Sequence, residues 1–266
     1  MNQLTRRGLI VAGSVAAGAA VTHAVDARGS GRHAQPHVAI TWDGPWSTVF
    51  SRGLPLFRKH DMVSTVYAVT EWVGETKPTV SWDRYCTWGE LEQLAEAGWE
   101  VSNHSRTHPH SMGRYTEAQA RPEVLGAKQD LVARGFATPG FAYPYSSPGP
   151  GVRAVVEEQH AYARAGQQLG DAVGNITSTE QLYTLPTQIM PVVGPDKLVA
   201  HTQSVCYDRG MSLIWLCHLV GPPLRTLSIE PDPLERYLAW LAGEQSAGRL
   251  MVSTAWDLVR SSLLSP

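Results

Sequence analysis

The sequence has few cysteines and almost no net charge. Its three cysteines are too few for a disulfide framework, and their spacing is not that of a zinc site. Cys206 and Cys217 can pair in an oxidising compartment, which would leave Cys86 as a buried thiol. A formal net charge of -2 gives no reason to expect nucleic acid or an anionic membrane as a partner.

Internal repeats and low-complexity tracts are also absent, apart from a short polar leader at 28–36. The chain has 266 residues, of which 43% are hydrophobic and 17% charged, as in soluble globular proteins. A single α/β domain of roughly 200–250 residues is a common solution at this length. We therefore expect one domain, over residues 37–266.

A long hydrophobic run is missing even at the N-terminus. Arg6 and Arg7 stand directly before an uncharged, Gly- and Ala-rich stretch that runs to about Ala24. The stretch is weakly hydrophobic and barely long enough for a stable membrane span. The pattern predicts a twin-arginine signal peptide over residues 1–27, cleaved after Ala24 or Ala27. We expect a mature protein that is secreted or lies in the periplasm or cell envelope.

Short apolar runs alternate with segments of helical period along the mature chain. The runs at 37–42, 64–69, 99–102, 140–143 and 211–217 predict strands. Between and after them, 50–60, 87–97, 116–134, 151–160 and 234–247 have the periodicity of helices. This alternation favours a (β/α) barrel or an open parallel sheet.

Four chemically capable residues follow predicted strands at their carboxyl ends: Asp43, His104, Tyr145 and His218. Functional groups of (β/α) folds gather at this edge of the sheet. Their common position makes this set the candidate site.

Two of the histidines have the spacing of metal ligands. His104 and His108 are four residues apart, so on one helical turn their Cβ atoms would lie about 5–6 Å from each other. Imidazole ligands suit Zn, with Co, Ni or Fe as alternatives. His110 is expected to be an exposed loop residue.

With these residues in place, the chain resembles the polysaccharide deacetylases, also called the NodB-homology or carbohydrate esterase family 4 enzymes. Residues 41–45 (TWDGP) look like the family's first motif, and 104–108 (HSRTH) look like its metal-binding pair. Residues 141–145 (FAYPY) and 216–218 (LCH) are similar to its third and late motifs.

The resemblance implies a deformed (β/α) barrel that removes N-acetyl, or sometimes O-acetyl, groups from an extracellular or cell-wall polysaccharide. It assigns Asp43 as the base, His104 and His108 as metal ligands, and His218 as the acid. The backbone N–H of Tyr145 is assigned to the oxyanion. In such chemistry a metal activates water and polarises the carbonyl, while a carboxylate and an imidazolium transfer protons.

Two positions depart from the family pattern. Gly44 stands where the metal-binding aspartate is normal, so Asp43 can be read as a ligand instead of the base, and Gly44→Asp should tighten metal binding if there is room. Ala142 stands where many members carry an arginine that orients the base. Two alternatives stay open: hydrolysis of another C–N or ester bond, and a metal-poor pseudoenzyme that only binds glycan.

The export signal can be tested directly. Changing Arg6 and Arg7 together to Lys should leave the precursor in the cytoplasm, because a receptor reads the arginine pair. Cell fractionation and immunoblotting of precursor and mature forms measure this. Normal export of the variant would contradict a twin-arginine signal.

Overall fold

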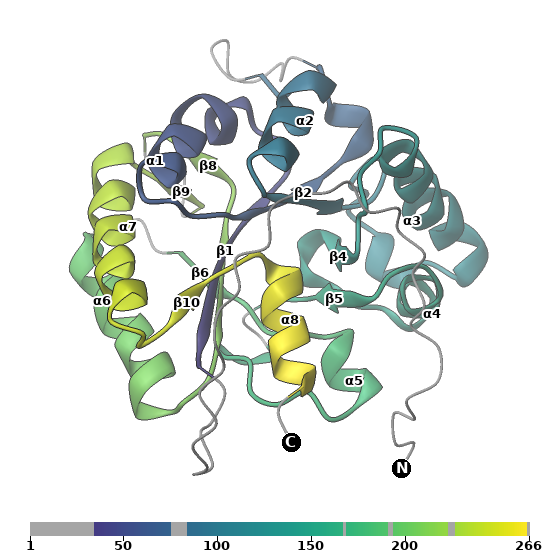
Figure 1. Ribbon diagram of the computed structural model, residues 1–266. Coiled ribbons are helices and arrows are strands. Elements are labelled where there is room, and N and C mark those ends of the chain that lie inside the picture. Colours follow the sequence, from purple (N-terminus) through teal and green to yellow (C-terminus); the bar gives the residue numbers. More distant parts are fainter. Residues whose placement is uncertain (1–34, 76–83, 167–168, 191–193, 223–226, 265–266) are drawn as a thin grey trace, which may run out of the picture.

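Strands and helices alternate along the chain in the computed structural model, which describes residues 35–75, 84–166, 169–190, 194–222 and 227–264 (Figure 1). The main sheet contains β1 (His37–Asp43), β2 (Thr65–Ala68), β3 (Glu100–Asn103), β4 (Gly140–Ala142), β5 (Tyr162–Arg164), β6 (Gln188–Ile189), β7 (Leu213–Cys217) and β10 (Met251–Val252). The helices are α1 (Leu54–Lys59), α2 (Trp88–Glu96), α3 (Glu117–Val132), α4 (Pro150–Gln159), α5 (Thr179–Leu182), α6 (Pro195–Gln203), α7 (Pro231–Ser246) and α8 (Ala255–Leu264). A separate parallel pair is formed by β8 (Leu219–Val220) and β9 (Ser228–Ile229).

The main sheet is parallel and curls into a barrel-like wall. Its strand order is β5-β4-β3-β2-β1-β7-β6, and β10 also pairs with β1. Backbone hydrogen bonds of Leu185 with Ala163 and Ala165 connect the β5 edge to the segment that leads into β6. Helices surround this wall (Figure 1). The predicted deformed (β/α) barrel, with a single domain, is confirmed.

Burial explains why the longer strands were readable from the sequence. β1 has the sequence HVAITWD and is buried from its second residue onward, as expected for a central parallel strand. The predicted strands at 64–69, 99–102, 140–143 and 211–217 correspond to β2, β3, β4 and β7 within one or two residues. The two- and three-residue strands β5, β6 and β10 were not predicted, because so few residues show no periodicity.

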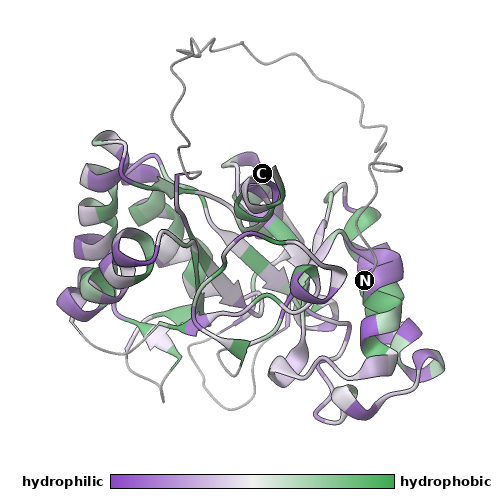
Figure 2. Cartoon of the chain, turned by 90° about the horizontal axis from the view of Figure 1, so that it is seen from below, coloured by the Kyte–Doolittle hydropathy of each residue, from purple (hydrophilic) through white to green (hydrophobic). Residues whose placement is uncertain are grey.

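Local capping explains the helix starts. Thr87 and Glu90 form a reciprocal capping box at α2, and Thr116 and Gln119 form another at α3. Proline occupies the first helical position of α4, α6 and α7, where its missing N–H has no cost. The helices carry both hydrophilic and hydrophobic residues, as expected of helices that cover a sheet with one face (Figure 2).

The three cysteines are buried free thiols. The pairing of Cys206 with Cys217 that the sequence allowed is therefore not formed. Cys206 lies in the turn after α6 and Cys217 ends β7, where burial raises the pKa of each thiol to about 12.

The predicted signal peptide, 1–27, lies outside the described residues. Within the described ranges, none of the helices combines the length and the apolar character needed to cross a membrane.

Candidate active site

Asp43, the last residue of β1, lies at the centre of the carboxyl edge of the sheet. Its side chain is nearly buried and its Oδ1 forms an ion pair with the guanidinium of Arg164. Its other oxygen, Oδ2, lies 3.8 Å from Nε2 of His104. The carboxylate is thus held on one side by a cation and faces an imidazole on the other.

Arg164 was not predicted as a site residue. It ends β5, is fully buried, and its guanidinium carbon lies 4.5 Å from the ring centroid of Tyr67. Burial lowers the pKa of Arg164 to about 9. A buried guanidinium requires a counter-charge, and Asp43 supplies it.

The guanidinium that the family pattern expects at position 142 therefore comes from the neighbouring strand. Ala142 on β4 is in register with Arg164 on β5. In the sequence, Arg164 is marked only by its position after a short apolar run. That signal is too weak to identify it as a site residue.

His104 directly follows β3 and is almost fully buried. Its Nδ1 lies 2.8 Å from the carbonyl oxygen of Ala142. Because a carbonyl only accepts, Nδ1 carries the proton and Nε2 presents a lone pair toward Asp43. Burial, with further contributions from His108 and His218, lowers the pKa of His104 well below its usual value, so the ring is neutral at physiological pH.

The segment from His104 to His108 is a loop, so the helical turn expected from the spacing is wrong. Ser105 and His108 both have left-handed backbones, with φ of 69° and 57°. The Asn103 side chain accepts from the Ser105 N–H at 2.8 Å, and the Ser105 hydroxyl accepts from the His108 N–H at 3.0 Å. These local side-chain bonds compete with helix formation. The two imidazoles still meet, with ring centroids 4.8 Å apart.

Aromatic rings flank His108 on two sides. Its ring centroid is 5.1 Å from that of Trp72 and 4.7 Å from that of Tyr145. Tyr145 is half exposed and in turn stacks on His110 at 4.4 Å. His110 is an exposed loop residue, as predicted.

His218 immediately follows β7 and is partly buried. Its backbone N–H donates to the carbonyl of Leu227 at 2.9 Å. Because Trp42 on β1 and Cys217 on β7 are in register, Asp43 and His218 follow them at the same edge of the sheet. The structure thus brings the five sequence-predicted site residues to one region of the barrel mouth.

Gly44 has no room for a side chain. Its φ is +88°, and a Cβ there would lie 2.9 Å from Nε1 of Trp46. The indole is nearly buried, packs on Tyr85 at 4.9 Å, and donates to the Asp43 carbonyl at 3.2 Å. An aspartate at 44 was expected to tighten metal binding only if there was room for it, and the Trp46 indole occupies the space that its side chain would need.

The donor set does not fit a closed metal site. Neutral His104 has the chemistry of a ligand, with its Nδ1–H fixed by a carbonyl as in many metal-binding histidines. Across the described ranges, however, no three His, Cys, Asp or Glu side chains lie close enough together to hold an ion. A catalytic zinc usually has three protein ligands, so these donors fall short of a complete catalytic metal site.

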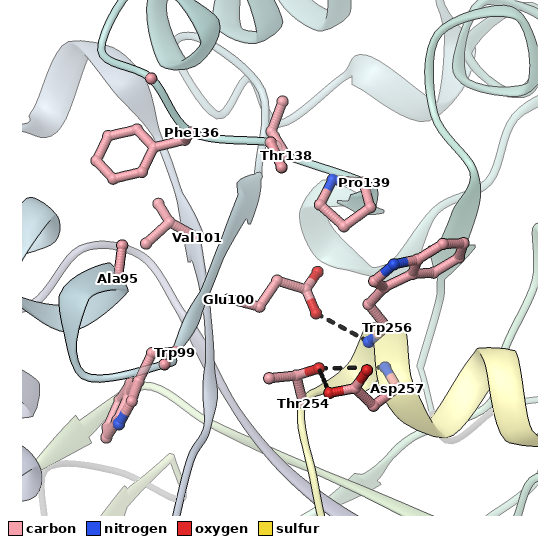
Figure 3. A pocket seen from close by; sticks show the side chains of 13 residues that line it. Ala95, Trp99, Glu100, Val101, Phe136, Thr138, Pro139, Thr254, Trp256 and Asp257 are labelled. Atoms are coloured by element: carbon pink, nitrogen blue, oxygen red, sulfur yellow. Dashed lines mark hydrogen bonds between the residues drawn. The ribbon is translucent and has the colours of Figure 1, made fainter. Parts of the chain in front are cut away.

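A cavity lies at the opposite, amino-terminal edge of the sheet, around Glu100 (Figure 3). It has a volume of about 300 Å³ and contains no histidine. The buried Glu100 carboxylate accepts four hydrogen bonds, from Ser102, Tyr162, Thr65 and the backbone N–H of Trp256. Burial raises the pKa of Glu100 while these bonds oppose the rise. Its lone pairs are taken, so it joins α8 to the barrel instead of binding a ligand.

Comparison with known proteins agrees with the arrangement. The sequence profile of the family described as polysaccharide deacetylase matches residues 30–163, just over half of the chain. None of the curated proteins matches the sequence.

Solved structures share the fold at low sequence identity. A family 4 carbohydrate esterase from Streptomyces lividans, in complex with acetate, is 16% identical with a TM-score of 0.53, covering 82% of this chain and 91% of its own. An acetyl xylan esterase from Clostridium thermocellum, in complex with cobalt, is 18% identical with a TM-score of 0.53, covering 84% and 90%. A family 4 pseudoenzyme from Bacillus anthracis is 18% identical with a TM-score of 0.56, covering 86% and 66%.

The packing of Trp46 predicts that Gly44→Asp destabilises the protein and does not tighten zinc binding. Overpacking of this kind costs about 1–3 kcal/mol. Gly74→Asp is the matched control, because Gly74 has a similar φ of +86° and nothing within 4 Å of its Cβ position. Urea unfolding and zinc titration calorimetry measure both effects. Equal destabilisation of the two variants, or tighter zinc binding by Gly44→Asp, would contradict the packing argument.

The buried ion pair predicts that Arg164→Met lowers the free energy of unfolding by about 3–5 kcal/mol, because it leaves the Asp43 carboxylate buried and unpaired. Adding Ala142→Arg should recover part of the loss, since residues in register on adjacent parallel strands face the same side. Arg260→Met is the control for a surface pair with Asp257, worth about 0–1 kcal/mol. Chemical denaturation measures all three, and a loss below about 1 kcal/mol for Arg164→Met would refute the role given to the pair.

Proposed function

Because the chain belongs to the polysaccharide deacetylase family, we propose that it hydrolyses acetyl groups, above all N-acetyl groups, on a polysaccharide. The observation that carries this is the Asp43 carboxylate, ion-paired with buried Arg164 and 3.8 Å from neutral His104. A negative group held near a neutral imidazole at the carboxyl edge of a barrel is a common arrangement for activating water.

In the reaction that we propose, the residues at this edge act one after another. Asp43 takes a proton from water, whose oxygen attacks the acetyl carbonyl carbon. The carbon–nitrogen bond then breaks, His218 gives its proton to the leaving amine, and acetate is released. The backbone N–H of Tyr145 faces the negative oxygen of the tetrahedral intermediate. Arg164 fixes the orientation of Asp43 through their ion pair.

Metal involvement is a separate proposal. We assign His104 and His108 as the ligands of a divalent ion, zinc first, with cobalt, nickel or iron as alternatives. Asp43 Oδ2 lies 3.8 Å from Nε2 of His104, so Asp43 either joins the two histidines as a ligand or stays the base. With two imidazoles and at most one carboxylate, we expect weak metal binding.

The cellular setting follows from the predicted signal at 1–27. A twin-arginine precursor delivers a folded protein to the cell envelope or the medium. We therefore place the substrate among extracellular or cell-wall polysaccharides.

A second function is favoured by one observation, the indole of Trp46 in the space beside Gly44. Without a further carboxylate the protein would bind acetylated glycan and not hydrolyse it. Its likeness in fold to the Bacillus anthracis pseudoenzyme is compatible with this alternative.

Acetate release from penta-N-acetylchitopentaose, with and without added zinc, tests the proposal. Asp43→Asn should lower the rate by about 10²–10⁴-fold, the usual contribution of a general base. His104→Ala and His108→Ala should weaken zinc binding by an order of magnitude or more, whereas Arg236→Gln, at an exposed position on α7, should change neither the rate nor zinc binding.

The outcomes separate the alternatives. Glycan binding without acetate release by the wild-type protein would support the pseudoenzyme. If Asp43→Asn lowers the rate but keeps zinc, Asp43 is the base, and if it loses both, Asp43 is a ligand. Wild-type activity in Asp43→Asn would sink the mechanism.

A further inference from the structure

A hollow of about 440 Å³ lies beside the candidate active site. Its lining residues are His110, Ser111, Gly113, Arg114, Tyr145 and Ser147. Tyr145 belongs to both places, because its ring also contacts His108 at 4.7 Å between centroids. A ligand in this hollow is therefore separated from His108 of the candidate site by the ring of Tyr145.

The walls of the hollow are formed by two loops that pack closely against each other. A Cβ on Gly113 would lie 1.9 Å from the Ser147 hydroxyl, and one on Gly149 would lie 1.8 Å from the Gly113 carbonyl oxygen. The two loops can approach so closely only because both positions are glycine. Tyr145 and Ser146 have left-handed backbones, with φ of 54° and 55°, a strained conformation typical of functional sites.

The lining offers the groups that recognise a sugar ring. Tyr145 is half exposed, and its hydroxyl lies 3.0 Å from Nε2 of His110, on which its ring stacks. This hydrogen bond fixes the orientation of the exposed ring. Side-chain hydroxyls of Ser111 and Ser147 complete the lining, so an apolar face stands beside hydrogen-bonding groups, as a pyranose requires.

Arg114 adds a positive charge to this lining. It is exposed and ends the 3-10 turn Met112–Arg114. No carboxylate within the described residues forms an ion pair with it, and no acidic residue lines the hollow. By contrast, Arg84, Arg121 and Arg153 are each paired with a glutamate. The charge of Arg114 is thus available to an anionic ligand, and a guanidinium matches a carboxylate in geometry.

We propose that this hollow binds a sugar residue that carries a carboxylate, next to the acetylated sugar at Asp43 and His104. The substrate is then an acidic acetylated polysaccharide, not a neutral one. The position of the acetylated sugar rests on the proposed function, whereas binding in the hollow can be measured without turnover.

The test compares two ligands of equal length. One is a tetrasaccharide of alternating N-acetylglucosamine and N-acetylmuramic acid, and the other is the same compound with its carboxylates methyl-esterified. Titration calorimetry at low salt should give about two- to fivefold tighter binding of the free acid, the range of a solvent-exposed ion pair. Raising the salt concentration should reduce this preference.

Variants test whether the preference for the free acid over the methyl ester arises in the hollow. Arg114→Gln should abolish it and Arg114→Lys should keep part of it, while Arg236→Gln, an exposed arginine on α7, should leave it unchanged. Equal affinity of the wild-type protein for the two ligands, or an undiminished preference in Arg114→Gln, would overturn the proposal. Acetate release from the free-acid tetrasaccharide is measured in parallel. If it is absent while the preference persists, the proposed function fails and the carboxylate site stands.

Discussion

The buried ion pair between Asp43 and Arg164 is the interaction on which the site depends. β1 and β5 are separated by β2, β3 and β4 in the sheet, so the guanidinium reaches across the inside of the curl to the carboxylate. Either charge alone would be expensive to bury, and together they tolerate burial because each neutralises the other. The pair therefore connects opposite walls of the barrel and sets the direction in which Asp43 faces His104.

Polar groups continue from this pair through the interior of the barrel. The ring of Tyr67 lies against Arg164, the hydroxyl of Tyr67 is 2.7 Å from that of Tyr162, and Tyr162 donates to Glu100. Glu100 in turn accepts from the first turn of α8. Buried polar networks stabilise a single structure only when their members are satisfied, as the carboxylate and the two hydroxyls are here. A continuous chain of contacts and hydrogen bonds thus connects the two edges of the sheet.

At Gly44, the space of the missing side chain is filled by another residue, but the missing carboxylate is not replaced. The Trp46 indole occupies the space that a side chain at 44 would need, and its N–H bonds to the Asp43 carbonyl. That bond supports the backbone of the residue whose carboxylate faces His104. The chain thus keeps the fold of the family without the carboxylate that the family pattern has at position 44. Any chemistry at this edge therefore depends more strongly on Asp43 and Arg164.

The sequence by itself determined the alternation of strands and helices and the positions of Asp43, His104 and His218 at strand ends. These features are local: an apolar run, a capping residue and the next polar residue are adjacent in the chain. Only the tertiary structure decided that Arg164 faces Asp43, that Trp46 fills the space beside Gly44, and that 104–108 is a loop. Each of these depends on contacts between segments distant in sequence or on side-chain bonds to the backbone, which outweigh local periodicity and spacing.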